Sequence, residues 1–516
     1  MVYVACPAGR RGPPNVAMRF TLPKRETLFF LVVAVVASAP AWIVKYPPIQ
    51  DVPFHLATIR VIHDIGNPVY GFGDLVLTLG RTQYVFYYLL ASVLSTFVGV
   101  VPANVLLMSA YLGGTPLAIR ELMRAFGKDG RAALLAVPLL VNVMFMFGLL
   151  PFLLGIPLMF WGLATAVRWF EAPTLRRGLL LAAISFALFY SHVFPFGIFG
   201  LGFAALFPWT RPREWIRAGL PTVPALLALA RWTLFTDAGK LTRGALRPGP
   251  EDGIAPLNQA LPGVFQWLTD VFKDTTDEAI LIATAMVAVF VVGLAQGDRD
   301  GSSDRSRAYV LLPLACVVLY FTMGEGHGYI WLIAQRFPIL FLLTAIPLLR
   351  MPIGLRGHLA TFAMAALGVA STVNTCRHFM KFQLEEVGDI DQAIAVMEPR
   401  KRVAALIFDR GSNVTNWAPF LHFGSYYQLH KGGIVQFSYA GYLHWPFDYK
   451  PGKYPPPGGA ARSRWEWTPE MVPARGELFP YYDYVLTRGE GFRPPAGTFH
   501  MKWRGDRWVV WERDAS

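Results

Sequence analysis

Asp51 is the first residue in this chain whose type and position could support chemistry. It lies in PPIQDVPFHLATIRVIHD, a stretch that follows the apolar run Thr27–Val44. Aspartate with a proline two positions later is a common helix start, and His55 then lies one turn further along the same face. Helix capping explains Asp51 as readily as catalysis does, and a polar residue at the membrane surface is the simpler role for His55. We predict Asp51 as a catalytic carboxylate, with His55 beside it.

Three further polar residues lie at the edges of apolar segments. His192, in YSHVFPFG, stands between two such segments, where a histidine is costly unless it faces a cavity. His327 and Arg336, in MGEGHGYIWLIAQRF, flank another apolar edge. A guanidinium at that depth suits a phosphate, because it binds two phosphate oxygens at once, although anchoring to lipid headgroups is an equally simple role. We predict substrate-binding roles for four residues: His55, His192, His327 and Arg336.

Several familiar catalytic signatures are missing from the sequence. It contains no phosphate-binding loop of the GxxxxGK[ST] type, no HExxH, no GxSxG and no closely spaced cysteine pair. Cys6, Cys316 and Cys376 are too widely spaced for a metal site or a disulfide framework. We therefore predict no metal ligands and no certain cofactor.

The composition is that of a protein embedded in a membrane. Of the 516 residues, 54% are hydrophobic and only 16% are charged, whereas soluble domains carry about 25% charged residues. The formal net charge of +13 gathers in short loops between apolar runs, as in membrane proteins, and no basic stripe lies outside such loops. The lipid bilayer is the predicted partner, and nucleic acid is excluded.

Charge-free runs predict a polytopic α-helical membrane protein with about eleven transmembrane helices. The predicted spans cover residues 27–44, 103–119, 132–147, 152–167, 178–191, 194–207, 218–235, 279–295, 308–323, 337–349 and 359–372. This divides the chain into a cytoplasmic tail (1–26), a transmembrane domain (27–373) with outer loops 45–83 and 236–278, and a soluble extracytoplasmic domain (374–516).

The orientation depends on how the apolar segment Tyr84–Val101 is placed. If that segment spans the membrane, the basic stretch Arg120–Arg131 falls outside, against the positive-inside rule. If it lies along the outer surface as an interfacial helix, every short basic loop falls on the cytoplasmic side. We adopt the second arrangement, with a cytoplasmic N-terminus and an extracytoplasmic C-terminal domain in a bacterial-type inner (plasma) membrane.

Residues 374–516 combine helix and strand patterns, which predicts an α/β domain. Three segments read as strands: RVAALIFD, IVQFSYA and YDYVLTRG. TFHMKWRGDRWVVWER reads as a hairpin that turns at RGD. RHFMKFQLEEVGDIDQAIAVM reads as an amphipathic helix, and APFLHFGSYYQLHKGG as a helix that ends at Gly432 and Gly433.

This layout resembles the GT-C superfamily of membrane glycosyltransferases over about residues 20–375. The shared features are an inside N-terminus, one span, and a long outer loop with an acidic residue close behind the span. The resemblance implies a polyprenyl-phosphate-linked sugar as donor and inversion at the sugar. It also implies Asp51 as the acid of the first loop, with Arg336, and His327 with it, on the lipid-phosphate side. Many members carry a pair of acids in this loop, whereas Asp51 stands alone, so the need for a divalent metal stays open.

Two other functions stay open on the sequence alone. A transporter or lipid flippase usually shows internal repeats and charges near the membrane midplane, whereas most charges here fall at the ends of predicted spans. A non-catalytic envelope protein would use the spans to anchor its outer domain, although eleven predicted spans are many for an anchor.

The predicted orientation can be tested at Arg124, which lies in the basic stretch placed on the cytoplasmic side. A membrane-impermeant thiol reagent added to intact cells should not label Arg124→Cys, because the bilayer separates the two. Labelling after permeabilisation is the positive control. Labelling in intact cells would show that Tyr84–Val101 spans the membrane.

Overall fold

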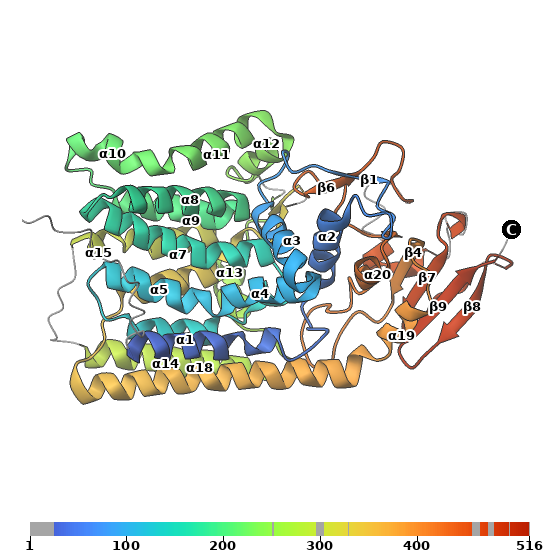
Figure 1. Cartoon of the computed structure of the whole chain (residues 1–516). Helices are drawn as coiled ribbons and strands as arrows, with labels where there is room; N and C mark the ends of the chain where they lie inside the picture. The colour runs from blue at the N-terminus through green and yellow to red at the C-terminus, as the bar shows by residue number, and fades with distance from the viewer. Residues whose placement is uncertain are drawn as a thin grey trace, which may run out of the picture.

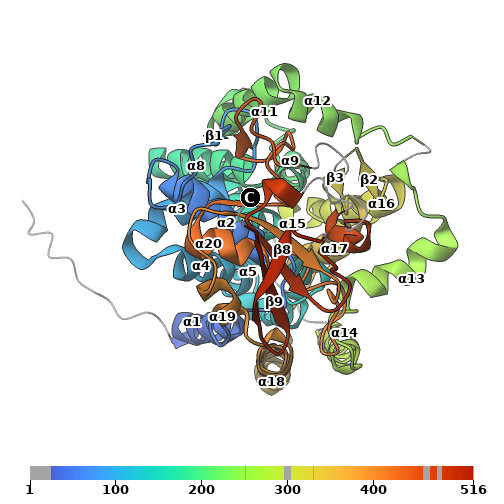
Figure 2. The ribbon, with the colours of Figure 1, turned by 90° about the vertical axis from the view of Figure 1, so that its right-hand side faces the viewer.

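The computed structural model describes residues 25–249, 252–295, 304–328, 330–456, 465–472, 479–494 and 496–514. Nearly all of the predicted cytoplasmic tail, residues 1–26, lies outside the described residues. The chain is mostly helical, with a sheet-containing region near the C-terminus. The long helices lie side by side along a common axis, and the C-terminal sheet lies at one end of them (Figure 1). Viewed from that end, α13, α14 and α18 lie at the rim of the helical part (Figure 2).

The first half of the helical part contains nine α-helices. They are α1 (Arg25–Ser38), α2 (Val52–Asp64), α3 (Phe86–Val98), α4 (Val100–Leu112), α5 (Gly114–Ala125), α6 (Val143–Phe147), α7 (Leu150–Glu171), α8 (Leu175–Ser191) and α9 (Val193–Leu206). The second half continues with α10 (Trp215–Gly219), α11 (Val223–Phe235), α12 (Asp237–Gly244), α13 (Leu257–Leu268), α14 (Thr276–Leu294), α15 (Asp304–Ala308), α16 (Leu311–Thr322), α17 (Phe337–Ala345) and α18 (Gly354–Phe382).

Five helical stretches among the described residues are long and apolar enough to cross a membrane. They are Val100–Ala125, Leu150–Glu171, Pro212–Phe235, Thr276–Leu294 and Gly354–Val387. Most other predicted spans coincide with shorter apolar helices. The predicted span 132–147 is broken into the 3₁₀ helix η2 (Gly130–Leu139), which contains Pro138, and α6. Pro138 lies within η2, and the break falls after it at residues 140–142, where the Asn142 side chain caps α6 by accepting the N–H groups of Met144 and Phe145.

Helices α2 and α3 cross the direction of the long helices near the sheet end (Figure 1). Asp51 occupies the N-cap position of α2, and a proline follows within the first turn, as the sequence predicts. The expected cap is wrong, however, because the Asp51 side chain makes no capping hydrogen bond. Its carboxylate is therefore left for other contacts.

The C-terminal region is built on a five-stranded sheet with the order β5-β4-β7-β9-β8. The strands are β4 (Arg402–Ile407), β5 (Ile434–Val435), β7 (Tyr484–Arg488), β8 (Phe499–Arg504) and β9 (Trp508–Arg513). Strand β4 pairs in parallel with β5 and β7, whereas β9 is antiparallel to β7 and β8. The strands predicted in RVAALIFD and YDYVLTRG and the predicted hairpin are confirmed, whereas the predicted strand IVQFSYA is a strand only at Ile434–Val435.

Both helices predicted for this region are shorter than expected. The amphipathic pattern from Arg377 onwards continues α18 through the π-helix Gln383–Val387, then breaks at Gly388, where φ is +64°. Helix α19 (Ile390–Ala395) follows that break. The second helix, α20 (Ser425–Lys431), begins only at Ser425, because residues 419–424 form turns. His422 therefore lies in a turn and not on a helix face.

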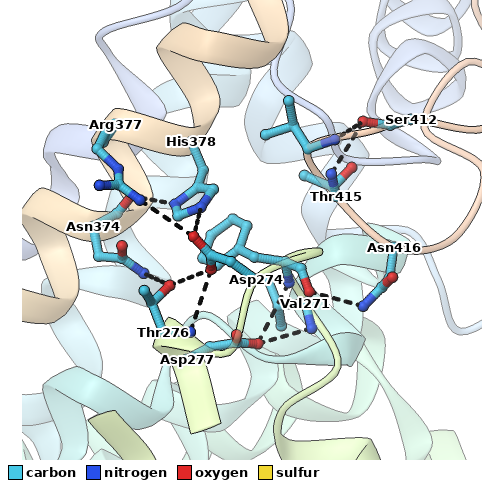
Figure 3. A network of polar contacts seen from close by, with 12 residues as sticks. Val271, Asp274, Thr276, Asp277, Asn374, Arg377, His378, Ser412, Thr415 and Asn416 are labelled. Carbon is cyan, nitrogen blue, oxygen red and sulfur yellow. Dashed lines mark hydrogen bonds and ion pairs between the residues drawn. The ribbon is translucent and has the colours of Figure 1, made fainter. Parts of the chain in front are cut away.

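Polar contacts fasten the C-terminal region to the helical part in several places, among them Arg60 Nε, on α2, which donates to the Leu429 carbonyl at 3.1 Å. Strand β1 (Leu75–Leu77), in the first loop, pairs with β6 (Phe447–Tyr449), and Arg81 Nη1 lies 2.8 Å from Asp448 Oδ2. At another place, Figure 3 shows Asn416 beside the turn that precedes α14. The Asn416 side-chain amide donates to Asp270 Oδ1 at 2.6 Å and to the Phe272 carbonyl at 3.0 Å. These contacts fix the face that the C-terminal region presents to α2.

Candidate functional site

A cavity of about 310 Å³ lies where the C-terminal region meets the helical part. Segments far apart in the sequence line it. The helical part contributes Gln50, Asp51, His55, Tyr84, Tyr88, Phe147, Gly148, Leu149, Pro151, Phe152, His192, Ile330, Trp331, Leu332 and Arg336. The C-terminal region contributes Leu421, His422, Phe437, Tyr439, Tyr442, His444, Trp445, Glu466 and Trp467.

The structure brings four of the five predicted site residues to this cavity: Asp51, His55, His192 and Arg336. His327 does not line it, which corrects its predicted place beside Arg336. Its ring packs against Gly244 at the end of α12, and its Nδ1 lies 2.8 Å from Asp252 Oδ1 in the loop before α13. The short strand that carries His327 turns the ring away from the cavity.

Asp51 is held by its backbone while its carboxylate faces the cavity region. Its N–H donates to the Phe147 carbonyl at 3.1 Å. Its Oδ1 lies 3.1 Å from His422 Nε2, an ion-pair contact, and no other polar contact to the carboxylate is found among the described residues. The side chain is 13% exposed. A carboxylate with spare acceptor capacity is thus presented to a small cavity.

His55 has no free ring nitrogen to offer a substrate. Its Nε2 lies 2.6 Å from the Gly148 carbonyl, so it must donate there, and its Nδ1 then accepts from the Tyr88 hydroxyl at 2.9 Å. Burial, partly opposed by the charge of Asp51, lowers the pKa of His55 to about 4. The ring is therefore neutral at pH 7. In the structure His55 holds the cavity wall at Gly148, and its substrate-binding role stays a prediction.

Arg336 is a buried cation without an acidic partner in the described part of the chain. Its Nη2 donates to the Trp331 carbonyl at 3.1 Å, whereas Nε and Nη1 have no partner there. The guanidinium lies 4.8 Å from the centre of the Phe194 ring and 5.6 Å from that of Phe152. Removing a charge from water without a partner of opposite charge costs on the order of several kcal/mol of free energy. An anion in the cavity would compensate that charge.

Neutral imidazoles flank Arg336. His192 caps α9 by accepting the Phe194 N–H at its Nδ1, 3.1 Å away, so in the neutral ring the proton is on Nε2. Burial, reinforced by the charges of Arg336 and Arg81, lowers the pKa of His444 to about 3. Tyr84 packs against both rings, with ring centres 4.8 and 5.5 Å away. This end of the cavity offers donors to an anion and contains no carboxylate among its described lining residues.

Two residues that sequence reasoning missed lie beside Asp51. His422 Nδ1 is 2.5 Å from Glu466 Oε1, and its Nε2 faces Asp51. Both side chains are almost fully buried. His422 lies in a segment predicted to be helical, and Glu466 lies between two tryptophans in a region without a clear pattern. No spacing relates either of them to Asp51, so the sequence carries no signal for this contact.

The acidic groups at the cavity are already engaged by a histidine. Asp51 and Glu466 contact the same His422 ring. Among the residues the structure describes, no group of three or more His, Cys, Asp or Glu side chains is placed to hold a metal ion.

A substitution at Gly148 tests how closely the cavity wall packs against Asp51. Its φ is +81°, and an added Cβ would lie 3.1 Å from both the N and the Cβ of Asp51. Gly148→Ala should therefore lower the free energy of unfolding by about 1–3 kcal/mol, measured by thermal unfolding in detergent. Gly197→Ala, in α9 with nothing within 4 Å, is the matched control. Equal midpoints for the two variants would contradict the tight contact.

The sequence was compared with protein-family models and with curated proteins. No protein-family model matches the chain, and no curated protein matches it.

Proposed function

We propose that the chain is a GT-C-like inverting membrane glycosyltransferase. It transfers a sugar from a polyprenyl-phosphate donor to an acceptor hydroxyl on the extracytoplasmic side. The observation that carries this proposal is the placement of Asp51 and Arg336 in the wall of one cavity. A carboxylate with spare acceptor capacity and a buried cation without an acidic partner are the two groups that such a transfer requires.

The position of the cavity supports an extracytoplasmic reaction. The cavity lies at the sheet end of the helices. By contrast, α10, α15 and the start of α18 lie at the opposite end (Figure 1). The sequence around α10 and the start of α18 contains the basic loops RPREWIR and RMPIGLRGH, and the loop at α15, QGDRDGSSDRSR, carries three arginines and three aspartates. Basic loops favour the cytoplasm, so this arrangement favours eleven spans with the cavity and the C-terminal region outside.

The end of the cavity around Arg336 suits the phosphate of the donor. Negative charge grows on the phosphate oxygen as the bond to the sugar breaks, and a fixed cation stabilises that charge. Nε and Nη1 of Arg336 are two nitrogens with N–H groups to donate, and the Nε2–H of His192 is a neutral donor. The aromatic rings beneath the guanidinium keep water away from it and strengthen the interaction.

Asp51 suits the role of general base. The acceptor oxygen forms a bond with C1 of the sugar while the bond between C1 and the phosphate oxygen breaks. The hydroxyl proton passes to Asp51, and the electron pair of the broken bond stays on the lipid phosphate beside Arg336. Attack from the side opposite the leaving phosphate inverts the configuration at C1, which is the outcome that the resemblance implies.

The proposal predicts that Asp51→Asn abolishes a glycan in the producing cell. Removing a general base slows transfer by about 10²–10⁴-fold, and the amide keeps the size of the side chain. The measurement is the glycan composition of cells that carry the variant in place of the original chain, at matched membrane amounts. Arg336→Gln should cause a similar loss, because it removes the charge at the leaving phosphate.

Asp237→Asn is the matched control for this experiment. Asp237 lies in the outer loop, and its side chain is 73% exposed. Its substitution should leave the glycans unchanged. Unchanged glycans in Asp51→Asn would instead rule out the catalytic role and leave transport or a structural role in the envelope.

A further inference from the structure

The His422 ring is clamped between two carboxylates from different parts of the chain. Its Nδ1 lies 2.5 Å from Glu466 Oε1, and its Nε2 lies 3.1 Å from Asp51 Oδ1. Glu466 belongs to the C-terminal region, whereas Asp51 precedes α2 in the first loop. A histidine interacts favourably with a carboxylate at each nitrogen only when both nitrogens carry hydrogen. The geometry therefore calls for the protonated imidazolium.

Aromatic packing fixes the plane of this ring. Phe54, in the first turn of α2, lies 3.9 Å from the His422 ring centre with an angle of 30° between the planes. Phe437 stacks nearly parallel to the ring, with centres 5.9 Å apart. Aromatic faces attract a cation and exclude water from it. The ring cannot turn away from Asp51 without disturbing α2 or the segment that carries Phe437.

The other titratable groups near His422 do not replace the two carboxylates. His55, on α2, is neutral for the reasons given above, and Tyr439 faces the ring edge-on with centres 6.3 Å apart. Burial opposes protonation of His422, but Glu466 and Asp51 outweigh it and raise the pKa of His422 to about 9. Burial raises the pKa of Glu466, and the charge of His422 opposes that rise.

We propose that His422, held by Glu466, is a positioning residue that orients the Asp51 carboxylate, so that the C-terminal region completes the transfer site. This inference rests on the proposed function, because it assigns His422 and Glu466 to the same reaction. It also gives the C-terminal region a role that the sequence left open. Asp51 is correctly oriented as the base only when the C-terminal region closes the cavity.

The proposal fixes where the reaction's proton goes. A doubly protonated imidazole has no lone pair left to accept a proton, so it cannot relay one from Asp51 to Glu466. The acceptor proton therefore stays on Asp51 until product leaves. If His422 loses its own proton, its Nε2 lone pair faces the Asp51 carboxylate, and the attraction that orients Asp51 disappears.

The protonation of His422 can be measured without any substrate. The full-length protein in detergent, labelled with ¹³C in its histidine rings, is titrated by NMR. The chain has 10 histidines, and the His422 signal is identified by its loss in His422→Asn. We expect a midpoint near 9, which falls by about one to three pH units in Glu466→Gln, because one of the two opposite charges is gone. A midpoint near the ordinary value of about 6.5, or one that Glu466→Gln does not move, would overturn the proposal.

Glycan production tests the positioning role. His422→Asn and Glu466→Gln should each reduce the glycan at least tenfold at matched membrane amounts. The exposed neighbours supply the controls His430→Asn and Glu470→Gln, which should have no effect. A purely structural role would lower the amount of protein without changing the glycan made per molecule.

The two proposals fail in different ways. If Asp51→Asn abolishes the glycan while His422→Asn does not, the positioning role is wrong and the transfer reaction stands. If neither variant changes the glycan, the transfer reaction is wrong, and the positioning role, which rests on it, falls as well. The NMR titration would then still report the charge on His422.

Discussion

The structure around the cavity depends on one contact, in which the His422 ring lies between Asp51 and Glu466. A buried carboxylate is costly unless it is paired, and here one cation serves two of them. The contact requires the C-terminal region to sit on α2 in a fixed way. The pairing of β1 with β6 and the hydrogen bonds of Asn416 hold it there. These links join segments that are distant in the sequence. They hold the first loop and the C-terminal region together, so that both line the same cavity.

The two ends of the cavity differ in their electrostatics. At one end Arg336 has no acidic partner among the described residues, and the histidines beside it, His192 and His444, offer neutral rings. At the other end His422 faces the Asp51 carboxylate. An anion is therefore favoured at the first end, and a proton acceptor is presented at the second. This division matches the proposed displacement, in which the negatively charged phosphate leaves on one side of the sugar and the acceptor hydroxyl loses its proton on the other.

Periodicity and unusual polar residues predicted much of the fold and part of the site. Apolar runs marked the helices because burial in lipid or protein requires them, and alternation marked the strands of the C-terminal sheet. Asp51, His192 and Arg336 stood out because polar residues at apolar edges are costly. His422 and Glu466 did not, since a polar residue outside the apolar runs looks the same in the sequence whether it is buried or exposed. The side-chain directions of Asp51 and His327 depend on tertiary packing that no spacing records. The exact positions at which helices break, at residues 140–142 and at Gly388, depend on it as well.

The most direct measurement is an experimental structure of the full-length protein with a polyprenyl phosphate bound. The account predicts the phosphate within hydrogen-bonding distance of the Arg336 guanidinium, with the space toward Asp51 left for the sugar and the acceptor. The corresponding polyprenol, which lacks the phosphate, should not occupy this site at the same concentration. A phosphate bound outside this cavity, with Arg336 uncontacted, would contradict the account.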